Sequence, residues 1–187
     1  MKNLKLLSLR AAIIITLGVV SFAATQARAA SAAAIDTASR AALRDLYAAN
    51  SKAHAIGMQA IAVLVFPSIT KAGFVVAAQH GDGALITKHG TAGYYNTVAA
   101  SYGLQAGLQK FGYALFFINR RAMNHLHERG GWALGSAPSL VVVDKGVSSS
   151  LSTTNLNRDI YAFFFNQKGL MGGLGLQGSK ITEIHPR

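Results

Sequence analysis

Three short motifs carry side chains that could do chemistry, and the first has the spacing of a serine acyl-transfer site. Ser68-Ile69-Thr70-Lys71 matches Ser-x-x-Lys, in which the lysine helps to deprotonate the serine. That chemistry needs both side chains on one helical turn, whereas Pro67 and Gly73 bracket the motif and indicate a turn between strands. The partner motifs Ser-Asp-Asn and Lys-Thr-Gly do not occur in the sequence. We therefore predict no enzymatic activity.

The other two motifs suggest a metal or a nucleotide site, and neither has the required geometry. His125, His127 and Glu128 are potential metal ligands, but residues that share a helix face are three or four apart, so the two histidines point to different faces. We interpret them as exposed helix residues and predict no metal site. Residues 173–180 are glycine-rich, yet Ser179 precedes Lys180, the reverse of the order in a phosphate-binding loop. No cofactor is predicted.

Basic and aromatic side chains offer a different chemistry, which is contact with lipid. Many basic residues lie beside glycine turns, and a cluster on one rim of a sheet could hold anionic headgroups at about 1 kcal/mol per charge. Consecutive aromatic residues point to both faces of a strand, so they either line an apolar surface for acyl chains or are covered on both sides. The candidate headgroup contacts are Lys71, Arg120, Arg121, Lys168 and Lys180, and the candidate apolar contacts are Phe116, Phe117, Trp132 and Phe164.

The composition restricts the class of protein and of partner. The chain has 187 residues, of which 51% are hydrophobic and 13% charged, so it is too apolar for a disordered protein. The absence of cysteine excludes disulfides, cysteine-ligated metals and a cysteine nucleophile. A net charge of +11 indicates an anionic partner. Because the sequence shows no recognised nucleic-acid-binding module, we favour phospholipid over nucleic acid.

The N-terminus has the pattern of a secretory signal peptide. Lys2, Lys5 and Arg10 precede an apolar run over 11–24, and Ala27-Arg28-Ala29 supplies a small-x-small cleavage pattern. The run is shorter than the ~20 residues of a spanning helix, although an uncleaved anchor is the alternative. We predict a signal peptide over 1–29, cleaved after Ala27 or Ala29, and a periplasmic or secreted product. Cleavage after Ala29 removes four basic residues and no acidic one, which lowers the net charge from +11 to +7.

The hydrophobic periodicity predicts an α+β domain over 36–187 after a flexible tail over 30–35. Apolar residues recur at helical spacing over 36–50, where Asp36 or Thr37 can cap an amphipathic helix. Weaker helical signals cover 54–59 and 122–129. We predict a strongly curled, mostly antiparallel sheet, sandwich- or barrel-like, with one further short helix. The predicted strands are 61–66, 73–80, 84–88, 93–96, 99–108, 113–119, 140–144, 160–166, 170–177 and 180–184, with a tight turn at 81–83.

Several stretches together resemble one family. They are Leu64-Val65-Phe66-Pro67-Ser68-Ile69-Thr70-Lys71-Ala72-Gly73-Phe74, Gly93-Tyr94-Tyr95-Asn96, Ala99-Ala100-Ser101-Tyr102-Gly103-Leu104-Gln105-Ala106-Gly107, Ala114-Leu115-Phe116-Phe117, Gly131-Trp132-Ala133-Leu134-Gly135, and Tyr161-Ala162-Phe163 followed by Gln167-Lys168-Gly169-Leu170-Met171 and Gly175-Leu176-Gln177-Gly178-Ser179-Lys180-Ile181. In this order, over roughly 36–184, they resemble the SYLF domain family. The resemblance implies phospholipid binding, actin binding in fungal members, and no enzymatic activity. Eukaryotic members attach the domain to SH3 or FYVE modules, which this chain lacks.

These observations favour non-enzymatic binding of an anionic phospholipid or membrane surface by an exported, peripherally membrane-associated SYLF-like domain. Export would place the chain away from actin, so we do not expect actin as a partner. The alternative is a structural or protein-interaction module of the cell envelope, because a low charged fraction in a strand-rich chain leaves sheet edges that can pair with another protein.

Overall fold

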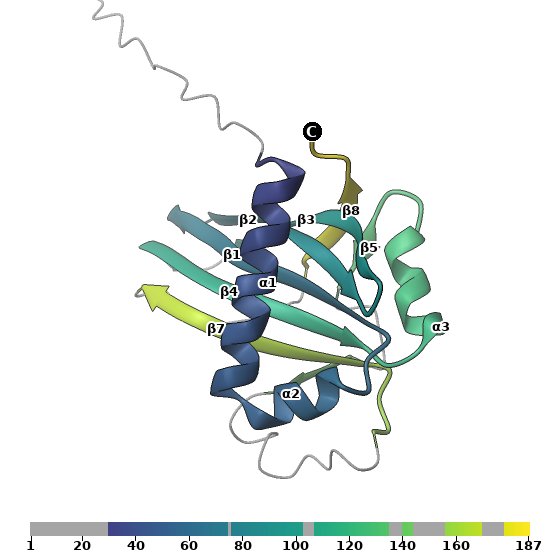
Figure 1. The fold of residues 1–187 in the computed structure, drawn as a ribbon. Helices are drawn as coiled ribbons and strands as arrows, with labels where there is room; N and C mark the ends of the chain where they lie inside the picture. The colour runs from purple at the N-terminus through teal and green to yellow at the C-terminus, as the bar shows by residue number, and fades with distance from the viewer. Residues whose placement is uncertain (1–29, 75, 103–106, 135–139, 144–155, 170–177) are drawn as a thin grey trace, which may run out of the picture.

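The computed structural model describes residues 30–74, 76–102, 107–134, 140–143, 156–169 and 178–187, which form one curled sheet with helices on both sides (Figure 1). The predicted signal peptide lies outside the described residues, as does the predicted strand 170–177. The helical elements are α1 (Ala32–Ala49), α2 (Ser51–Gly57), α3 (Arg120–Met123) and the 3₁₀ helix η1 (Asn124–His127). The strands are β1 (Ala62–Phe74), β2 (Val76–Thr87), β3 (Gly90–Tyr102), β4 (Gly107–Phe117), β5 (Trp132–Ala133), β6 (Leu140–Val143), β7 (Ile160–Gly169) and β8 (Lys180–Ile184).

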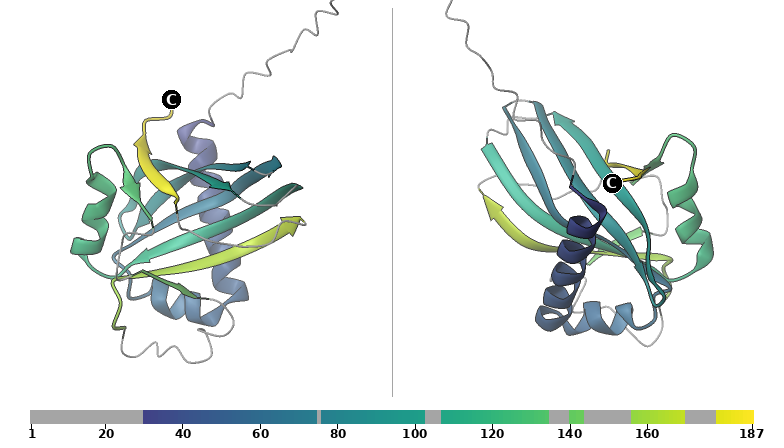
Figure 2. Two further views of the ribbon diagram at one scale, coloured as in Figure 1. Left: turned by 180° about the vertical axis from the view of Figure 1, so that it is seen from behind. Right: turned by 45° about the horizontal axis from the view of Figure 1, so that its top comes forward.

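The predicted fold class is confirmed. The eight strands follow the order β5-β8-β3-β2-β1-β4-β7-β6, and every pairing is antiparallel except the one between β6 and β7. The sheet curls into a half-barrel, which is clearest from behind and from above (Figure 2). The helix α1 crosses one face, as expected for an α+β domain in which a sheet must bury an apolar face.

Helix α1 begins four residues before its predicted start. The Ser31 hydroxyl accepts a hydrogen bond from the Ala34 N–H at 3.2 Å and so caps the helix. Residues 32–35, predicted to be part of a flexible tail, therefore form its first turn. Asp36, predicted to be a cap, has a different role described below. The second helix, α2, starts where Asn50 accepts a bond from the Ala53 N–H at 3.0 Å.

Strand β1 continues through Pro67, where the sequence predicts a stop. The register with β4 shifts between Phe66 and Ile69, so Pro67 lies in a bulge. Proline has no N–H to donate to the ladder, and a bulge is a position that tolerates this loss. The strand therefore reaches 13 residues instead of the predicted six.

The predicted turn at 81–83 is wrong, because β2 runs straight through it. The glycines there allow the backbone of β2 to lie close to the bulged part of β1. A Cβ on Gly83 would lie 2.3 Å from the carbonyl oxygen of Val65, and a Cβ on Gly81 would lie 2.8 Å from that of Ser68. Glycine inside a strand permits such contact. Residues 76–80 and 84–87 of the two predicted strands thus belong to one strand, β2, paired with β1 and β3, whereas Gly73 and Phe74 form the end of β1.

The predicted helix over 122–129 starts earlier and is shorter. The Asn119 side chain caps α3 by accepting a bond from the Ala122 N–H at 2.9 Å, and the chain continues into η1 rather than into a longer α-helix. Ala122 and Leu126 are buried on the sheet face opposite α1. Together with α2, this gives the fold more helical elements than the one short helix predicted.

Two apolar clusters form the core, one on each face of the sheet. The cluster under α1 and α2 includes Leu46, Val65 and Phe116. The opposite cluster includes Leu64 and Phe117. Because successive strand residues alternate between faces, the centres of β1 and β4 are apolar without interruption and are covered on both sides.

One polar group in the core is fully satisfied. Tyr113 is buried, and its hydroxyl donates to the Thr97 hydroxyl at 2.9 Å. Burial raises the pKa of the Tyr113 hydroxyl, which is opposed by its bond to Thr97. The phenol therefore stays neutral and links β4 to β3 across the core.

A polar contact holds the first turns of α1 over the start of β3. The Asp36 carboxylate accepts hydrogen bonds from Arg40 Nε, at 2.8 Å, and from the Thr91 hydroxyl, which in turn accepts from the Arg40 guanidinium at 2.8 Å. The bonds from Arg40 and Thr91 hold the pKa of the Asp36 carboxyl below its usual range. The ionised carboxylate is thus the form that fixes the helix to the sheet.

We expect Asp36→Asn to lower the free energy of unfolding by roughly 1 kcal/mol or less at pH 7, because the pair is partly exposed. A lowered pKa means that the contribution is complete above the unfolded-state value of about 3.9 and is lost as the pH falls through the folded-state value. Urea unfolding at pH 7 and at successively lower pH should therefore show that the free energies of unfolding of the wild type and the variant converge. Asp45→Asn, at an exposed position of the same helix, is the control. A wild-type advantage that persists in strong acid would contradict this role.

Candidate functional site

Three of the four predicted apolar lipid contacts are core residues. Phe116, Phe117 and Trp132 are 0% exposed, which corrects the prediction that they contact lipid. Phe116 packs edge-on against Phe163, and Phe117 lies 6.1 Å from Trp132 between ring centroids. Both faces of β4 are covered at this point, so consecutive aromatics fill two separate clusters.

Phe164 is only partly buried and packs on Phe111 and Tyr113, with ring centroids 5.8 and 5.9 Å apart. Its predicted lipid contact stays a prediction.

The two histidines predicted to be exposed differ, because His125 is only partly exposed. His125 stacks on Trp132 with ring centroids 5.5 Å apart and shares a 2.6 Å hydrogen bond between its Nδ1 and Glu128 Oε1. His127 is exposed. Within the described ranges, no three side chains of His, Asp or Glu are grouped as a metal site requires.

The Ser-x-x-Lys motif does not form a catalytic pair. Ser68 is exposed in the bulge, whereas Lys71 is 8% exposed and lies on the sheet face opposite α1, together with Ile69. Residues three apart on a strand point to opposite faces, so the lysine cannot take a proton from the serine. The burial also corrects the prediction that Lys71 contacts an external headgroup.

The predicted cluster of five basic residues does not form. Arg120 and Arg121 follow the C-terminal end of β4, and Arg121 donates to Asp159 at 2.7 Å. Lys168 lies beside the opposite end of the same strand. Lys180, at the start of β8, is paired with Val98 of β3. Of the five predicted residues, Lys168 and Lys180 therefore lie at the end of the sheet away from Arg120 and Arg121.

The strand register instead places basic residues in one row across the sheet. Lys110 of β4 pairs directly with Lys168 of β7 and with Thr70 of β1, which pairs with His80 of β2. His80 pairs with Val98, which pairs with Lys180. All six side chains are exposed. We call this set the basic row: Lys180, Val98, His80, Thr70, Lys110 and Lys168.

A bulge in β7 brings Lys168 into the row. Lys110 pairs with Lys168 and Gly112 pairs with Phe165, so an advance of two residues along β4 corresponds to three residues along β7. Asn166 absorbs the extra residue with a φ of 53°, a left-handed conformation that asparagine tolerates better than most residues. The Phe165 ring covers Gly112, where a Cβ would lie 2.2 Å from it.

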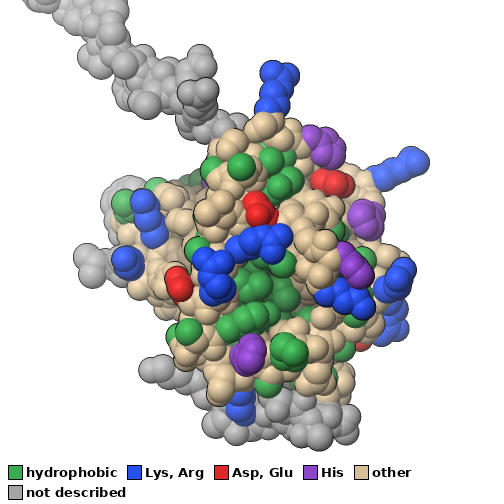
Figure 3. Space-filling view, viewed as in Figure 1, with side chains coloured by type: hydrophobic (Ala, Val, Ile, Leu, Met, Phe, Trp, Pro, Cys, Tyr) green, Lys and Arg blue, Asp and Glu red, His purple; other side chains and the backbone are tan. Residues whose placement is uncertain are grey.

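The basic row lies on the face that carries α1, beyond the helix. Lys110 alternates with Phe111, which belongs to the opposite cluster, and so shares its face with Ala114 and Phe116 under α1. Figure 1 shows the ends of β1, β4 and β7 projecting to the left of α1, and Figure 3 shows Lys or Arg side chains on the surface there.

One member of the row, His80, has a carboxylate partner in Asp82, whereas the three lysines have none among the described residues. No ion pair joins Lys110, Lys168 or Lys180 to any residue within the described ranges. Asp82, two residues from His80, accepts a bond from Asn96 at 2.7 Å. Like charges directly opposite each other on paired strands are destabilising, so the Lys110–Lys168 pair favours an anionic ligand.

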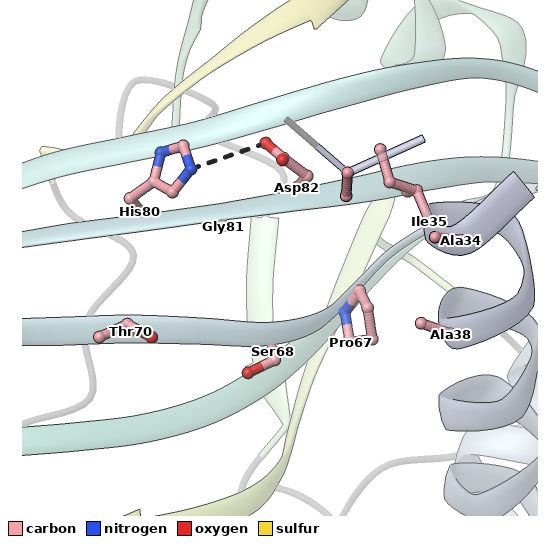
Figure 4. A pocket seen from close by; sticks show the side chains of 10 residues that line it. Ala34, Ile35, Ala38, Pro67, Ser68, Thr70, His80, Gly81 and Asp82 are labelled. Atoms are coloured by element: carbon pink, nitrogen blue, oxygen red, sulfur yellow. Dashed lines mark ion pairs between the residues drawn. The ribbon is translucent and has the colours of Figure 1, made fainter. Parts of the chain in front are cut away.

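A pocket of about 410 Å³ lies next to the row, between the start of α1 and strands β1 and β2 (Figure 4). Ala34, Ile35 and Ala38 of the helix face Pro67 across it. At its edge, His80 Nε2 lies 3.8 Å from Asp82 Oδ1. Its walls are mostly apolar, so it suits an apolar group better than an anion.

Of the six residues in the row, the sequence predicted Lys168 and Lys180 as headgroup contacts and missed the other four, of which Lys110 is the charged partner of Lys168. Its importance comes from pairing with Lys168, which is distant in the sequence. The alternation Gln109-Lys110-Phe111 is a signal that Lys110 faces away from Phe111, but it does not reveal the partner strand.

Residues 98–185 match the family model described as "Ysc84: Las17-binding protein actin regulator". The match runs from the end of β3 to β8 and so contains Lys110, Lys168 and Lys180. The comparison with curated proteins finds no match.

Trp132 is the sole tryptophan of the chain, so its fluorescence tests its assigned place in the core. We expect a blue-shifted emission and weak quenching by acrylamide, both unchanged when anionic vesicles are added. Both should change together on unfolding in urea. A shift caused by vesicles under conditions that leave the circular dichroism unchanged would show that the indole reaches lipid, contrary to its burial.

Proposed function

Residues 98–185 belong to the Ysc84, or SYLF, domain family, and from this premise we propose that the chain binds anionic phospholipid at a membrane surface without catalysing a reaction. The family is of the lipid- and actin-binding type. The observation that carries the proposal is the Lys110–Lys168 pair within the basic row, because two adjacent exposed ammonium groups with no ion-pair partner among the described residues suit lipid phosphates.

The proposed binding is reversible and electrostatic in its first step. Each lysine near an anionic surface contributes about 1 kcal/mol, and the attraction weakens with salt because the Debye length falls to about 8 Å at physiological ionic strength. The row has one residue on each of six adjacent strands, so it extends about 24 Å across the sheet, perpendicular to the strands, at the usual strand spacing. It can therefore contact several phosphates at once.

The geometry gives no support to an enzymatic alternative. Ser68 and Lys71 lie on different sides of β1. None of the helices in the described ranges is long and apolar enough to cross a membrane. We propose that the chain associates peripherally through the sheet, because the basic row is exposed there.

We also propose that residues 1–29 direct export, on the basis of their charge and apolar pattern. An exported chain would meet the lipids of the cell envelope. Actin would then not be a partner, even though the family description names actin regulation.

Lys110→Glu combined with Lys168→Glu should lower partitioning onto anionic vesicles at least tenfold, because the change replaces attraction by repulsion at about 1 kcal/mol per charge. Co-sedimentation with vesicles of phosphatidylglycerol and phosphatidylcholine, at low and high salt, measures this. Neutral vesicles should bind the wild type much more weakly.

The control is Lys88→Glu combined with Arg120→Glu, which makes the same change of net charge at exposed positions outside the row. We expect the control to lose much less binding. Equal losses in the two double variants would show that net charge alone drives binding. Absence of wild-type binding to anionic vesicles at low salt would overturn the proposed function.

A further inference from the structure

We propose that the strand ends beyond the basic row enter the membrane, so that an apolar tip contacts acyl chains while the row contacts phosphates. The tip consists of Ala72, Val76, Ala78, Ala100 and Leu108. This inference rests on the proposed function and adds to it a depth and an orientation of the bound protein.

The register places these residues on one face, ahead of the row. Ala72 pairs with Ala78 and with Leu108, and Ala78 pairs with Ala100. Each is two residues beyond a member of the row, so the tip shares its face with the row and with α1. Val76 lies two residues beyond Ala78, beside the β1–β2 connection.

The two large side chains of the tip are unusually exposed. Val76 is 57% exposed and Leu108 is 55% exposed. The remaining members are alanines, and residues 72–78 and 98–102 contain no charged side chain. A continuous exposed apolar surface bordered by polar residues marks a site of protein or membrane contact.

The spacing fits the boundary between headgroups and acyl chains. Two residues along a strand span about 6.6 Å, so Leu108 lies about 7 Å ahead of the row and Val76 about 13 Å ahead. Interfacial elements bury their apolar side about 5–10 Å into this boundary. With the lysines at the phosphates, Leu108 therefore reaches the start of the acyl region.

A bilayer fits this surface better than a second copy of the chain. A symmetric dimer through the tip would place the same patch of each chain against the other. It would bring the exposed Lys110 and Lys168 of both copies close together. An anionic bilayer complements both the charge and the apolar surface.

The absence of cysteine in the chain allows a direct test, because each single-cysteine variant can be labelled at one site. We would attach an environment-sensitive fluorophore to Leu108→Cys and to Val76→Cys. The control is Val142→Cys, on β6, where the wild-type side chain is 38% exposed. Circular dichroism and thermal unfolding would establish that each labelled variant is folded, and two tip positions keep the test decisive if one fails.

On binding to phosphatidylglycerol vesicles, a tip label should shift its emission to the blue and be quenched by nitroxides placed on the acyl chains. The label at 142 should do neither. If the wild type binds these vesicles while both tip labels stay in a water-like environment, the inference is wrong and the proposed function stands. If the wild type binds no vesicles, both are overturned. A tip label that responds to protein concentration without lipid, together with a dimer in light scattering, would assign the tip to a second copy.

A binding comparison completes the test. Leu108→Asp combined with Val76→Asp should weaken vesicle binding at least tenfold. Met58→Asp combined with Val142→Asp, at exposed apolar positions elsewhere, should leave it nearly unchanged. Equal binding by the two double variants would contradict insertion of the tip.

Discussion

The burial of β1 and β4 on both faces is the constraint on which the rest of the structure depends. Phe116 and Phe117 are adjacent in sequence and fully buried on opposite sides of the sheet. A sheet buried in this way needs a layer on each side. Helices α1 and α2 supply one layer, and α3, η1 and Trp132 supply part of the other. A strand of 13 residues is about 43 Å long, whereas a crossing helix is about 10–12 Å wide. One end of the α1 face is therefore left uncovered.

The uncovered end and the covered end differ in chemistry as well as in packing. Under α1 the strand residues are large, apolar and buried, whereas beyond it the row is basic or polar apart from Val98, and the tip is apolar but exposed. On the α1 face the apolar core lies under the helix, and the row beyond the helix is exposed and does not belong to that core. The family match covers β4, β7 and β8, the strands that carry the three lysines of the row.

The fold class was predictable from the sequence, and the site was not. Local patterns identified the helix that contains Leu46 and the strand over 180–184, because periodicity and turn residues act over a few positions. Pro67 and Gly81 were misread, since their conformations depend on each other through the bulge of β1 against β2. The pairing of Lys110 with Lys168 is non-local, and no local pattern specifies which strands become neighbours. Phe116 and Trp132 were ambiguous because the sequence does not show what covers each face.

The bulge at Asn166 determines which side of the sheet carries a charge. Side chains alternate along a strand with a period of two, so one added residue reverses the phase of every position after it. Lys168 faces the same side as Lys110 because of that single insertion. A deletion at this point would turn the lysine toward the opposite face while leaving the amino-acid composition of the strand end nearly unchanged. The electrostatic pattern of the surface is thus encoded partly in the length of β7, and one-residue insertions or deletions can alter it without any substitution.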